Sequence, residues 1–421
     1  MTDARQGISF EHLFRREAGR MTAALTRVFG TRNLPLVEDV VHDALCRALE
    51  TWRFGDIPDN PSAWLMTAAK RRAIDVLRRE RTARTLEPAV AAEIEAAGEL
   101  APGADDVFGD EAVQSAELRM MFCCCHARLP EETQVALVLN LLGGFSVAEV
   151  AAAFLSGEAA MEKRLQRGKA VLAEAGKLPE VTPARVAEHL GAVHGALYLL
   201  FNEGYHGANE RETVRGELCA EAIRLTELLA ASEPTAVPAT FALLALMCLT
   251  AARLPARRGD GGELLAAAKQ ERARFDQALV ARGVAALERS ATGDELTAFH
   301  VEAAIAYEHA TAPTHAALDH RRILAHYDVL LRLKPSPVVA LNRAIALAEI
   351  EGPDAALAAI AAIEGKERLA AYPFFEAAFG ELELRAGPPE RARDHFEAAR
   401  RLARGDAERA FFEARLRALA R

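Results

Sequence analysis

The side chains with the clearest chemistry form a basic run between Met66 and Arg84. This segment holds seven lysines and arginines against two acidic residues, and the chain's two tryptophans, Trp52 and Trp64, lie ahead of the run or at its edge. Basic groups bind phosphates and aromatic rings stack on unpaired bases, so the run predicts contact with nucleic acid. A solvated helix face is the alternative. The candidate contacts are Trp64, Lys70, Arg71, Arg72, Arg78 and Arg79.

A second basic helix is predicted over 158–173. We expect its apolar side, Met161, Leu165 and Leu172, to point inward and Lys163, Arg164, Arg167 and Lys169 to point outward. This helix follows a short helix over 147–154, for which Ser146 and Glu149 form a capping box, and a turn at Ser156-Gly157. A short helix, a glycine turn and a basic second helix indicate a helix-turn-helix, whose second helix enters the major groove. Other helical hairpins share this pattern. The candidate contacts are Glu158, Glu162, Lys163, Arg164, Arg167 and Lys169.

The cluster Cys123-Cys124-Cys125-His126 resembles a metal site only in composition. Neighbouring helical residues point about 100° apart, so these side chains cannot converge on one tetrahedral zinc ion. We expect buried cysteines in mid-helix, with no metal and no cofactor. The sequence has no P-loop and no GxGxxG, GxSxG or HExxH motif, so it gives no support for an enzyme.

These side chains must be positioned by helices, because strand patterns are almost absent. Apolar residues recur at three- and four-residue spacing, which predicts an all-α fold. Helices are expected over about 9–29, over 35–52 and after Pro61, where Asn60 can cap. The helix over 35–52 is apolar on one face, and its other face carries Glu38, Asp39, His42 and Asp43.

The net charge of the 421 residues is −9, which taken alone would argue against nucleic-acid binding. The charge is unevenly distributed, however: the net charge is +4 over residues 1–85, −8 over residues 86–112 and zero over residues 113–177. The acidic stretch, rich in alanine, glycine and proline, predicts a flexible linker. The predicted organisation is two small helical domains at 8–85 and 113–177, joined by the linker 86–112 and followed by a helical extension at 178–320 and repeats at 321–421.

The C-terminal half predicts a helical repeat. Tyr327, Ile360 and Phe396 share one apolar pattern and are 33 and 36 residues apart, close to the ~34-residue tetratricopeptide period. Such repeats offer a groove to a protein or peptide partner, and a plain helical bundle is the alternative. Ahead of them, an apolar helix runs into a polar, glycine-containing segment. It is a candidate regulatory pocket, or a helix end with a left-handed glycine and buried aromatics; its residues are Asn202, Glu203, Tyr205 and His206.

No apolar run approaches the ~18–20 residues of a membrane span, and the N-terminus lacks the apolar core of a signal peptide. Six cysteines, three of them consecutive, do not make a disulfide framework. The sequence therefore predicts a cytoplasmic protein without membrane contact.

The two N-terminal blocks together resemble the extracytoplasmic-function (ECF) sigma factors of the sigma-70 superfamily. The resemblance covers about residues 8–175: the stretch 37–44 is similar to region 2.2, the stretches 61–65 and 69–79 to regions 2.3–2.4, and 164–169 to the end of the region 4.2 helix. Arg71 stands where asparagine is usual and His42 where glutamine is frequent. Gly157 and Ala160 replace common serine and threonine.

The resemblance implies a cytoplasmic transcription-initiation factor, nucleoid-associated within the holoenzyme. Bacterial core RNA polymerase would be bound through its β′ clamp helices and β flap, with Glu38, Asp39, His42 and Asp43 as the contacts on this chain. The second basic helix would read the −35 promoter element, and the first would recognise and melt the −10 element. A subgroup carries such a C-terminal extension as a modulator of activity. A helix-turn-helix regulator or tetratricopeptide adaptor that never touches polymerase is the rival interpretation.

Overall fold

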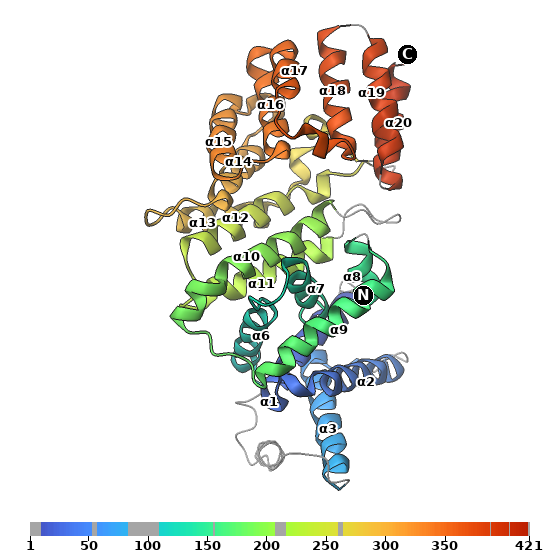
Figure 1. Cartoon of the computed structure of the whole chain (residues 1–421), viewed down its shortest axis with the longest axis vertical. Coiled ribbons are helices and arrows are strands. Elements are labelled where there is room, and N and C mark those ends of the chain that lie inside the picture. The colour runs from blue at the N-terminus through green and yellow to red at the C-terminus, as the bar shows by residue number, and fades with distance from the viewer. Residues whose placement is uncertain are drawn as a thin grey trace, which may run out of the picture. The chain divides into compact units, whose positions relative to one another are not determined.

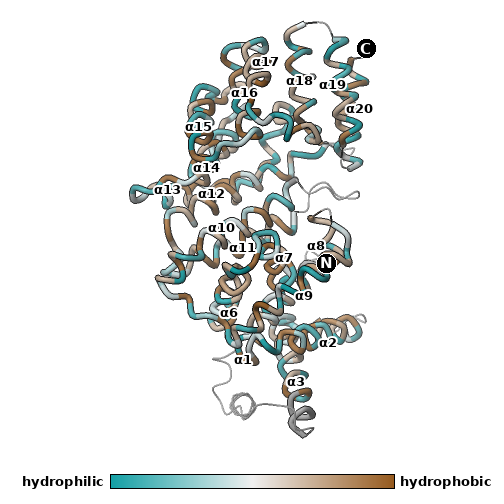
Figure 2. Tube along the Cα trace, viewed as in Figure 1, coloured by the Kyte–Doolittle hydropathy of each residue, from teal (hydrophilic) through white to brown (hydrophobic). Residues whose placement is uncertain are grey.

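The computed structural model describes residues 10–52, 57–82, 109–154, 156–206, 216–259, 264–387, 389–403 and 405–419. Within these ranges the chain forms 18 α-helices, several short 3-10 helices and no strand, which confirms the all-α prediction (Figure 1). Polar and apolar residues alternate along most helices (Figure 2). The 3-10 helices are η1 (Thr31–Asn33), η2 (Leu254–Ala256), η3 (Ala267–Lys269), η4 (Arg272–Arg274), η5 (His315–Ala317) and η6 (Lys366–Leu369).

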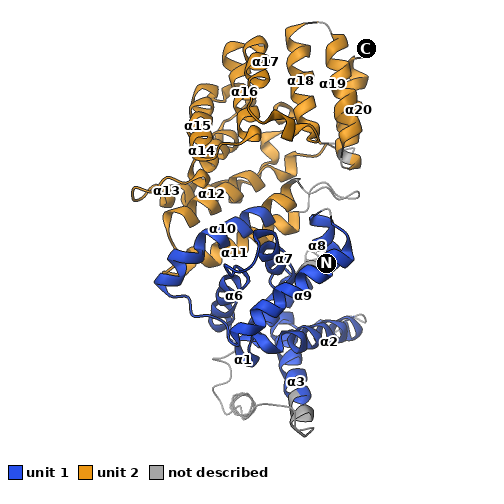
Figure 3. Ribbon diagram, in the orientation of Figure 1, with its two compact units in different colours: residues 1–200 blue, residues 201–421 orange. Residues whose placement is uncertain are grey.

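The chain divides into two compact units, residues 1–200 and 201–421 (Figure 3). Helix α10 (Pro183–His206) contains the boundary. The first unit carries every candidate nucleic-acid residue of the sequence analysis, and the second unit carries the predicted repeats.

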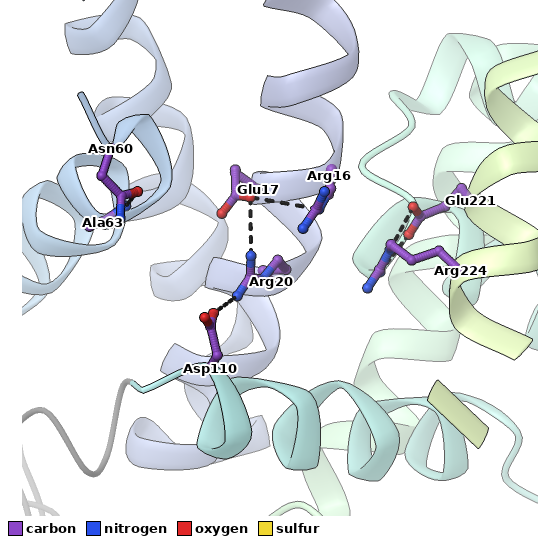
Figure 4. Close-up of polar contacts among 8 residues, drawn as sticks. All are labelled: Arg16, Glu17, Arg20, Asn60, Ala63, Asp110, Glu221 and Arg224. Atoms are coloured by element: carbon purple, nitrogen blue, oxygen red, sulfur yellow. Dashed lines mark hydrogen bonds and ion pairs between the residues drawn. The ribbon is translucent and has the colours of Figure 1, made fainter. Parts of the chain in front are cut away.

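Three long helices open the first unit: α1 (Phe10–Phe29), α2 (Leu34–Trp52) and α3 (Pro61–Thr82). As predicted, Asn60 caps α3, its Oδ1 accepting from the backbone N–H of Ala63 at 3.0 Å (Figure 4). One apolar face of each helix meets the others in a common core, formed by Met21, Ala24, Leu25, Phe29, Val37, Val40, Val41, Ala44, Ala48, Trp52, Leu65, Met66, Ala69 and Ala73.

Four further helices follow: α6 (Asp110–Cys124), α7 (Glu131–Leu141), α8 (Val147–Ala153) and α9 (Glu158–Ala175). The capping box of Ser146 and Glu149 is present, so the predicted start of α8 is confirmed. The helix-turn-helix is thus formed by α8 and α9, with Gly157 at the N-cap of α9.

The structure changes two expected boundaries around α6. Residues 86–108 of the predicted linker lie outside the described residues, but Asp110, Glu111 and Ala112 are already helical. Acidic residues in a first helical turn are favoured by the helix dipole, and Arg27 donates to the carbonyl of Ala112 at 3.0 Å. At the other end α6 stops at Cys124, so Cys125 caps the helix and His126 lies in a turn instead of mid-helix.

The two helix groups of the first unit share their core instead of standing apart. Val113 of α6 belongs to the core cluster of α1–α3 and is 1% exposed. Arg20 of α1 pairs with Glu17 of its own helix and with Asp110 of α6, as Figure 4 shows. Because Glu17 is buried, this pairing also neutralises a carboxylate inside the unit.

The second unit begins with four packed helices: α11 (Gly216–Ala231), α12 (Pro238–Ala251), α13 (Gln277–Ser290) and α14 (Ala298–Thr311). On α11, Arg224 pairs with Glu221 one turn earlier at 2.7 Å (Figure 4). One described segment, Pro238–Ala256, is long and apolar enough to cross a membrane by length and composition alone, although no apolar run of that length was expected from the sequence. However, 72% of its most apolar window is buried inside the protein, as in the core helix of a globular domain.

Six helices complete the second unit: α15 (His320–Leu333), α16 (Pro337–Glu351), α17 (Pro353–Ala361), α18 (Pro373–Ala386), α19 (Pro389–Leu402) and α20 (Asp406–Leu419). The apolar pattern of the sequence falls on α15, on α17 and the turn after it, and on α19. The pattern has three positions in each of these segments, of which Tyr327, Ile360 and Phe396 are the central ones. All except Tyr327 are buried: Ile323, Leu330, Ala356, Ile360, Ile363, Ala392, Phe396 and Ala399. Each of these three helices packs on a neighbouring helix, as consecutive helical hairpins require.

His309 on α14 makes the stability of the second unit sensitive to acid. Burial, together with the positive charges of the nearby Arg253, Arg272, His315 and His320, lowers its pKa from 6.5 to about 3. Between pH 6.5 and 3, His309 is protonated in the unfolded chain but neutral in the folded chain. The free energy of unfolding therefore falls as the pH decreases from 6.5 towards 3.

We predict that His309→Gln flattens this dependence. Between pH 6 and 4 the free energy of unfolding, measured by urea denaturation, should fall less steeply than in the wild type, by up to about 1.4 kcal/mol per pH unit. His194, whose pKa burial lowers to about 4, remains in both proteins and leaves a residual slope. Equal slopes in the two proteins contradict the assignment to His309.

Candidate nucleic-acid interface

A hollow of about 530 Å³ lies where α2 faces the start of α3. Trp64 forms part of its wall while packing on Trp52, with ring centroids 5.3 Å apart. Trp64 is half-buried, so it takes part both in the core and in the wall of the hollow. The remaining lining residues are Arg47, Pro58, Asn60, Ala63, Thr67, Ala68, Arg71, Arg72 and Asp75.

This hollow combines an aromatic wall with a cationic rim. Arg47 and Arg71 are exposed, and Arg72 is held by Asp43 of α2, Nε to Oδ2, at 2.8 Å. Guanidinium groups bind phosphate oxygens and an aromatic wall accepts a base, so the arrangement suits an unpaired nucleotide. Lys70 is half-buried on the same helix, whereas the side chains of Arg78 and Arg79 lie outside the described residues.

The acidic face predicted on α2 is present, and the structure adds partners to it. Asp39, His42 and Asp43 are exposed. Glu38 is only half-exposed because its Oε1 pairs with Nζ of Lys169 on α9. The acidic face is thus coupled to both basic elements: through Asp43 to α3 and through Glu38 to α9.

Helix α9 presents the predicted basic residues on two different sides. Met161, Leu165 and Leu172 point inward and are buried, as expected. The side chains open to solvent are Glu158, Glu162, Lys163, Gln166 and Arg167.

Two side chains of α9 differ from the sequence interpretation. Arg164 and Lys169 were expected to point outward, but both are half-buried. Arg164 is paired with Glu132 of α7 at 2.9 Å, and Lys169 with Glu38. Both lie at the sides of the helix, where neighbouring elements supply carboxylates.

The segment around Gly204 is a helix contact and has no left-handed glycine. Helix α10 continues through Gly204 to His206, and the φ of Gly204 is not positive. A Cβ there would lie 2.7 Å from Cβ of Leu218 and 2.8 Å from the backbone nitrogen of Cys219, so the glycine allows α10 and α11 to approach closely. The helix end with a left-handed glycine, offered as the alternative from sequence, is therefore wrong.

Tyr205 is buried as that alternative required. Its ring stacks on Phe201 at 5.9 Å and lies under the guanidinium of Arg257 at 3.9 Å, and its carbonyl accepts from Arg257 at 2.7 Å. Asn202 and Glu203 are half-buried, and the side chain of His206 is outside the described residues. A regulatory pocket at these four residues stays a hypothesis.

The three consecutive cysteines are buried, as expected. Burial raises the pKa of Cys123 and of Cys125 to about 12, so both are protonated thiols at neutral pH. Within the described part of the chain, no group of three or more histidine, cysteine, aspartate or glutamate side chains could hold a metal ion.

Arg47 and Asp75 also line the hollow, although neither was predicted from the sequence. Arg47 lies one helical turn after Asp43, on the face of α2 that carries the acidic residues. The four-residue spacing from Asp43 could have indicated that Arg47 shares this face. For Asp75 the only signal was its place inside a basic run, which does not tell which way its side chain points.

Comparisons with known proteins match separate parts of the chain. Residues 13–83 match sigma-70 region 2, residues 119–172 match sigma-70 region 4, and residues 189–291 match a family of unknown function (DUF6596). An uncharacterized protein of Rhizobium meliloti (strain 1021) is 37% identical over 401 residues, which are 94% of this chain and 92% of that protein. No solved structure matches the chain.

Two glycines of α10 provide a matched test of the helix contact. Gly204→Ala should lower the free energy of unfolding by about 1–3 kcal/mol, because the added methyl group meets the backbone of α11. Gly195→Ala makes the same change in the same helix with nothing within 4 Å of the new Cβ. It should be neutral or stabilise by up to about 1 kcal/mol. Urea denaturation compares the two, and equal effects would reject the close contact.

Proposed function

Because the chain belongs to the sigma-70 superfamily, as an ECF-type sigma factor with a C-terminal extension, we propose that it binds bacterial core RNA polymerase and directs initiation at a specific set of promoters. One observation carries the proposal furthest. In residues 13–83, the hollow lined by Trp64, Arg71 and Arg72 lies beside an exposed acidic face. A free-standing DNA regulator has no use for that pairing.

The acidic face of α2 is the proposed contact with the β′ clamp helices. Asp39, His42 and Asp43 are exposed, so basic side chains of a partner can reach them without prior desolvation. Glu38 completes the face once Lys169 no longer holds it. The β flap is the proposed second contact of the polymerase with residues 119–172.

The hollow between α2 and α3 is the proposed site for the melted −10 element. An unpaired base would stack on Trp64 while Arg71 and Arg72 neutralise neighbouring phosphates, with Lys70, Arg78 and Arg79 continuing the basic track. Arg71 places a long, positively charged donor where the family usually has asparagine, whose amide is short and neutral. Arg71 is therefore better suited than asparagine to bind a phosphate.

Helix α9 is the proposed reader of the −35 element. Lys163 and Arg167 are exposed and suit base edges or phosphates. Glu158 and Glu162, near the start of the helix, can accept from cytosine amino groups. Arg164 and Lys169 would bind phosphates after leaving Glu132 and Glu38.

The C-terminal extension is the proposed modulator of this activity. Its helical hairpins leave a hollow of about 530 Å³ whose lining includes Arg343, Glu364 and Arg368, which suits a protein or peptide partner. The protein would act in the cytoplasm and join the nucleoid within the holoenzyme. No cofactor, metal or catalytic residue is part of the proposal.

Reconstitution of the full chain with core polymerase on genomic DNA tests the function directly. We expect run-off transcripts from a defined promoter set that core polymerase alone does not produce. A rival helix-turn-helix regulator would bind duplex DNA without core polymerase and start no transcript. Absence of promoter-specific initiation by the reconstituted enzyme rejects the proposal.

Two substitutions should separate polymerase binding from promoter opening. Asp39→Lys places a positive charge against a basic clamp and should weaken core binding at least about tenfold. Arg71→Ala should leave core binding intact and reduce open-complex formation, read by permanganate footprinting. Asp294→Lys, an exposed charge reversal in the second unit, is the control for net charge. If Arg71→Ala opens promoters as well as the wild type does, the −10 assignment is wrong.

A further inference from the structure

Two arginines in the connection between α12 and α13 lack the carboxylate partners that other arginines of the second unit have. Several of those others pair with carboxylates of neighbouring helices, at Arg282–Glu227, Arg322–Glu308, Arg343–Asp328 and Arg385–Glu349. Arg253 and Arg272 are half-buried and make no such pair within the described part of the chain. Because removing a charge from water without a counter-charge costs free energy, these two guanidinium groups need an explanation.

Both arginines are oriented by neutral groups. Arg253 donates through Nε and Nη2 to Oε1 of Gln270, at 3.3 and 3.0 Å. Arg272 donates through Nη1 to the carbonyl of His309 at 2.7 Å, and its guanidinium lies 5.5 Å from the ring centre of Phe275. Among the described residues, Nη1 of Arg253 and Nη2 of Arg272 have no hydrogen-bond partner. The two groups are therefore held in place with their charges uncompensated and donors unused.

Three histidines from the end of α14, from η5 and from the start of α15 lie beside these arginines. The ring centres of His315 and His320 are 6.2 Å apart, and both side chains are half-buried. The carbonyl that Arg272 reaches is that of His309. Burial lowers the pKa of His309, and so do the positive charges of both arginines and of the other two histidines, because all five groups are close together. In the part of the chain that the structure describes, none of the three imidazoles pairs with a carboxylate.

We propose that this cluster is a binding site for a small phosphate-bearing anion. A phosphate monoester carries about −1.5 to −2 charges at pH 7, which matches the two fixed guanidinium charges, whereas one carboxylate would balance only one of them. The unused nitrogens of Arg253 and Arg272 are donors that phosphate oxygens accept, and the rings of His315 and His320 add further nitrogens. The site goes beyond the proposed role in transcription and does not depend on it.

His315 gives the site a proton-linked signature. Burial lowers its pKa, as do the neighbouring positive charges, while the carboxylate of Glu349 acts in the opposite direction. The titratable and charged groups around it are Arg253, Arg272, His309, His320 and Glu349. A bound dianion stabilises the protonated imidazole and raises its pKa. Anion binding should therefore take up a proton and become tighter as the pH falls.

Calorimetric titration of the full chain with inorganic phosphate, at fixed ionic strength, tests the site. We expect saturable binding of phosphate and weaker binding of acetate, which is a monoanion. Arg272→Gln should raise the phosphate Kd at least about tenfold, because it removes a fixed charge and charge-assisted hydrogen bonds.

Arg274→Gln is the matched control for this substitution. Arg274 lies in the same 3-10 helix, η4, and also donates to a backbone carbonyl, that of Arg258 at 3.4 Å. Its side chain is exposed and is not one of the five grouped cations. The control therefore makes the same change of charge and should leave the phosphate Kd unchanged.

His315→Gln is the second variant, for the case that Arg272→Gln fails to fold. Within the described residues the imidazole of His315 makes no hydrogen bond, so its loss should be tolerated. Sulfate is the probe here, since it remains a dianion throughout the range in which histidine titrates. The sulfate Kd of the wild type should fall as the pH decreases from about 8 to about 6, and His315→Gln should reduce this dependence.

Glycerol phosphate distinguishes the two sources of such an anion. Tighter binding of glycerol phosphate than of inorganic phosphate indicates a phosphorylated metabolite as the ligand, and weaker binding indicates free phosphate. Either result supports a phosphate site.

A purely structural role of the cluster makes opposite predictions. Equal phosphate affinity of folded Arg272→Gln and Arg274→Gln overturns the proposal, as does an absence of phosphate binding by the wild type. Acetate binding as tight as phosphate binding overturns the assignment to a dianion. A sulfate Kd with the same pH dependence in the wild type and in His315→Gln removes His315 from the site.

Discussion

The first unit depends on one close backbone approach, that of α1 to the turn between α7 and α8. Gly19 and Gly144 have no Cβ at the two points where carbonyl oxygens of the opposite segment lie nearest. The short distance brings Arg15 onto Phe145 and within reach of Glu149. Val113 of α6 also joins the core of α1–α3.

Charge is organised around this approach. The acidic face of α2 and the basic side of α9 are the surfaces with which a sigma factor would meet a basic clamp and acidic DNA, and in this structure part of each satisfies the other. The internal pair joins the same kinds of charge that the proposed polymerase and DNA contacts would join.

The second unit shows the same use of glycine for a different purpose. Gly204 lies inside α10 and allows the backbone of α11 to approach, while Tyr205 is fixed between Phe201 and Arg257. Farther on, the buried positions of α15, α17 and α19 repeat at similar spacing and build consecutive hairpins.

Much of this protein was determined by local sequence alone. Helical periodicity, the Asn60 cap, the Ser146–Glu149 capping box and the inward side of α9 depend on residues within a few positions of each other, and all are present. Only the tertiary structure decided the partners of Lys169, Arg164 and Arg15, the helical role of Gly204 and the shared core. Periodicity reports that a helix has a buried face, but a carboxylate more than 100 positions away leaves no mark on the local pattern.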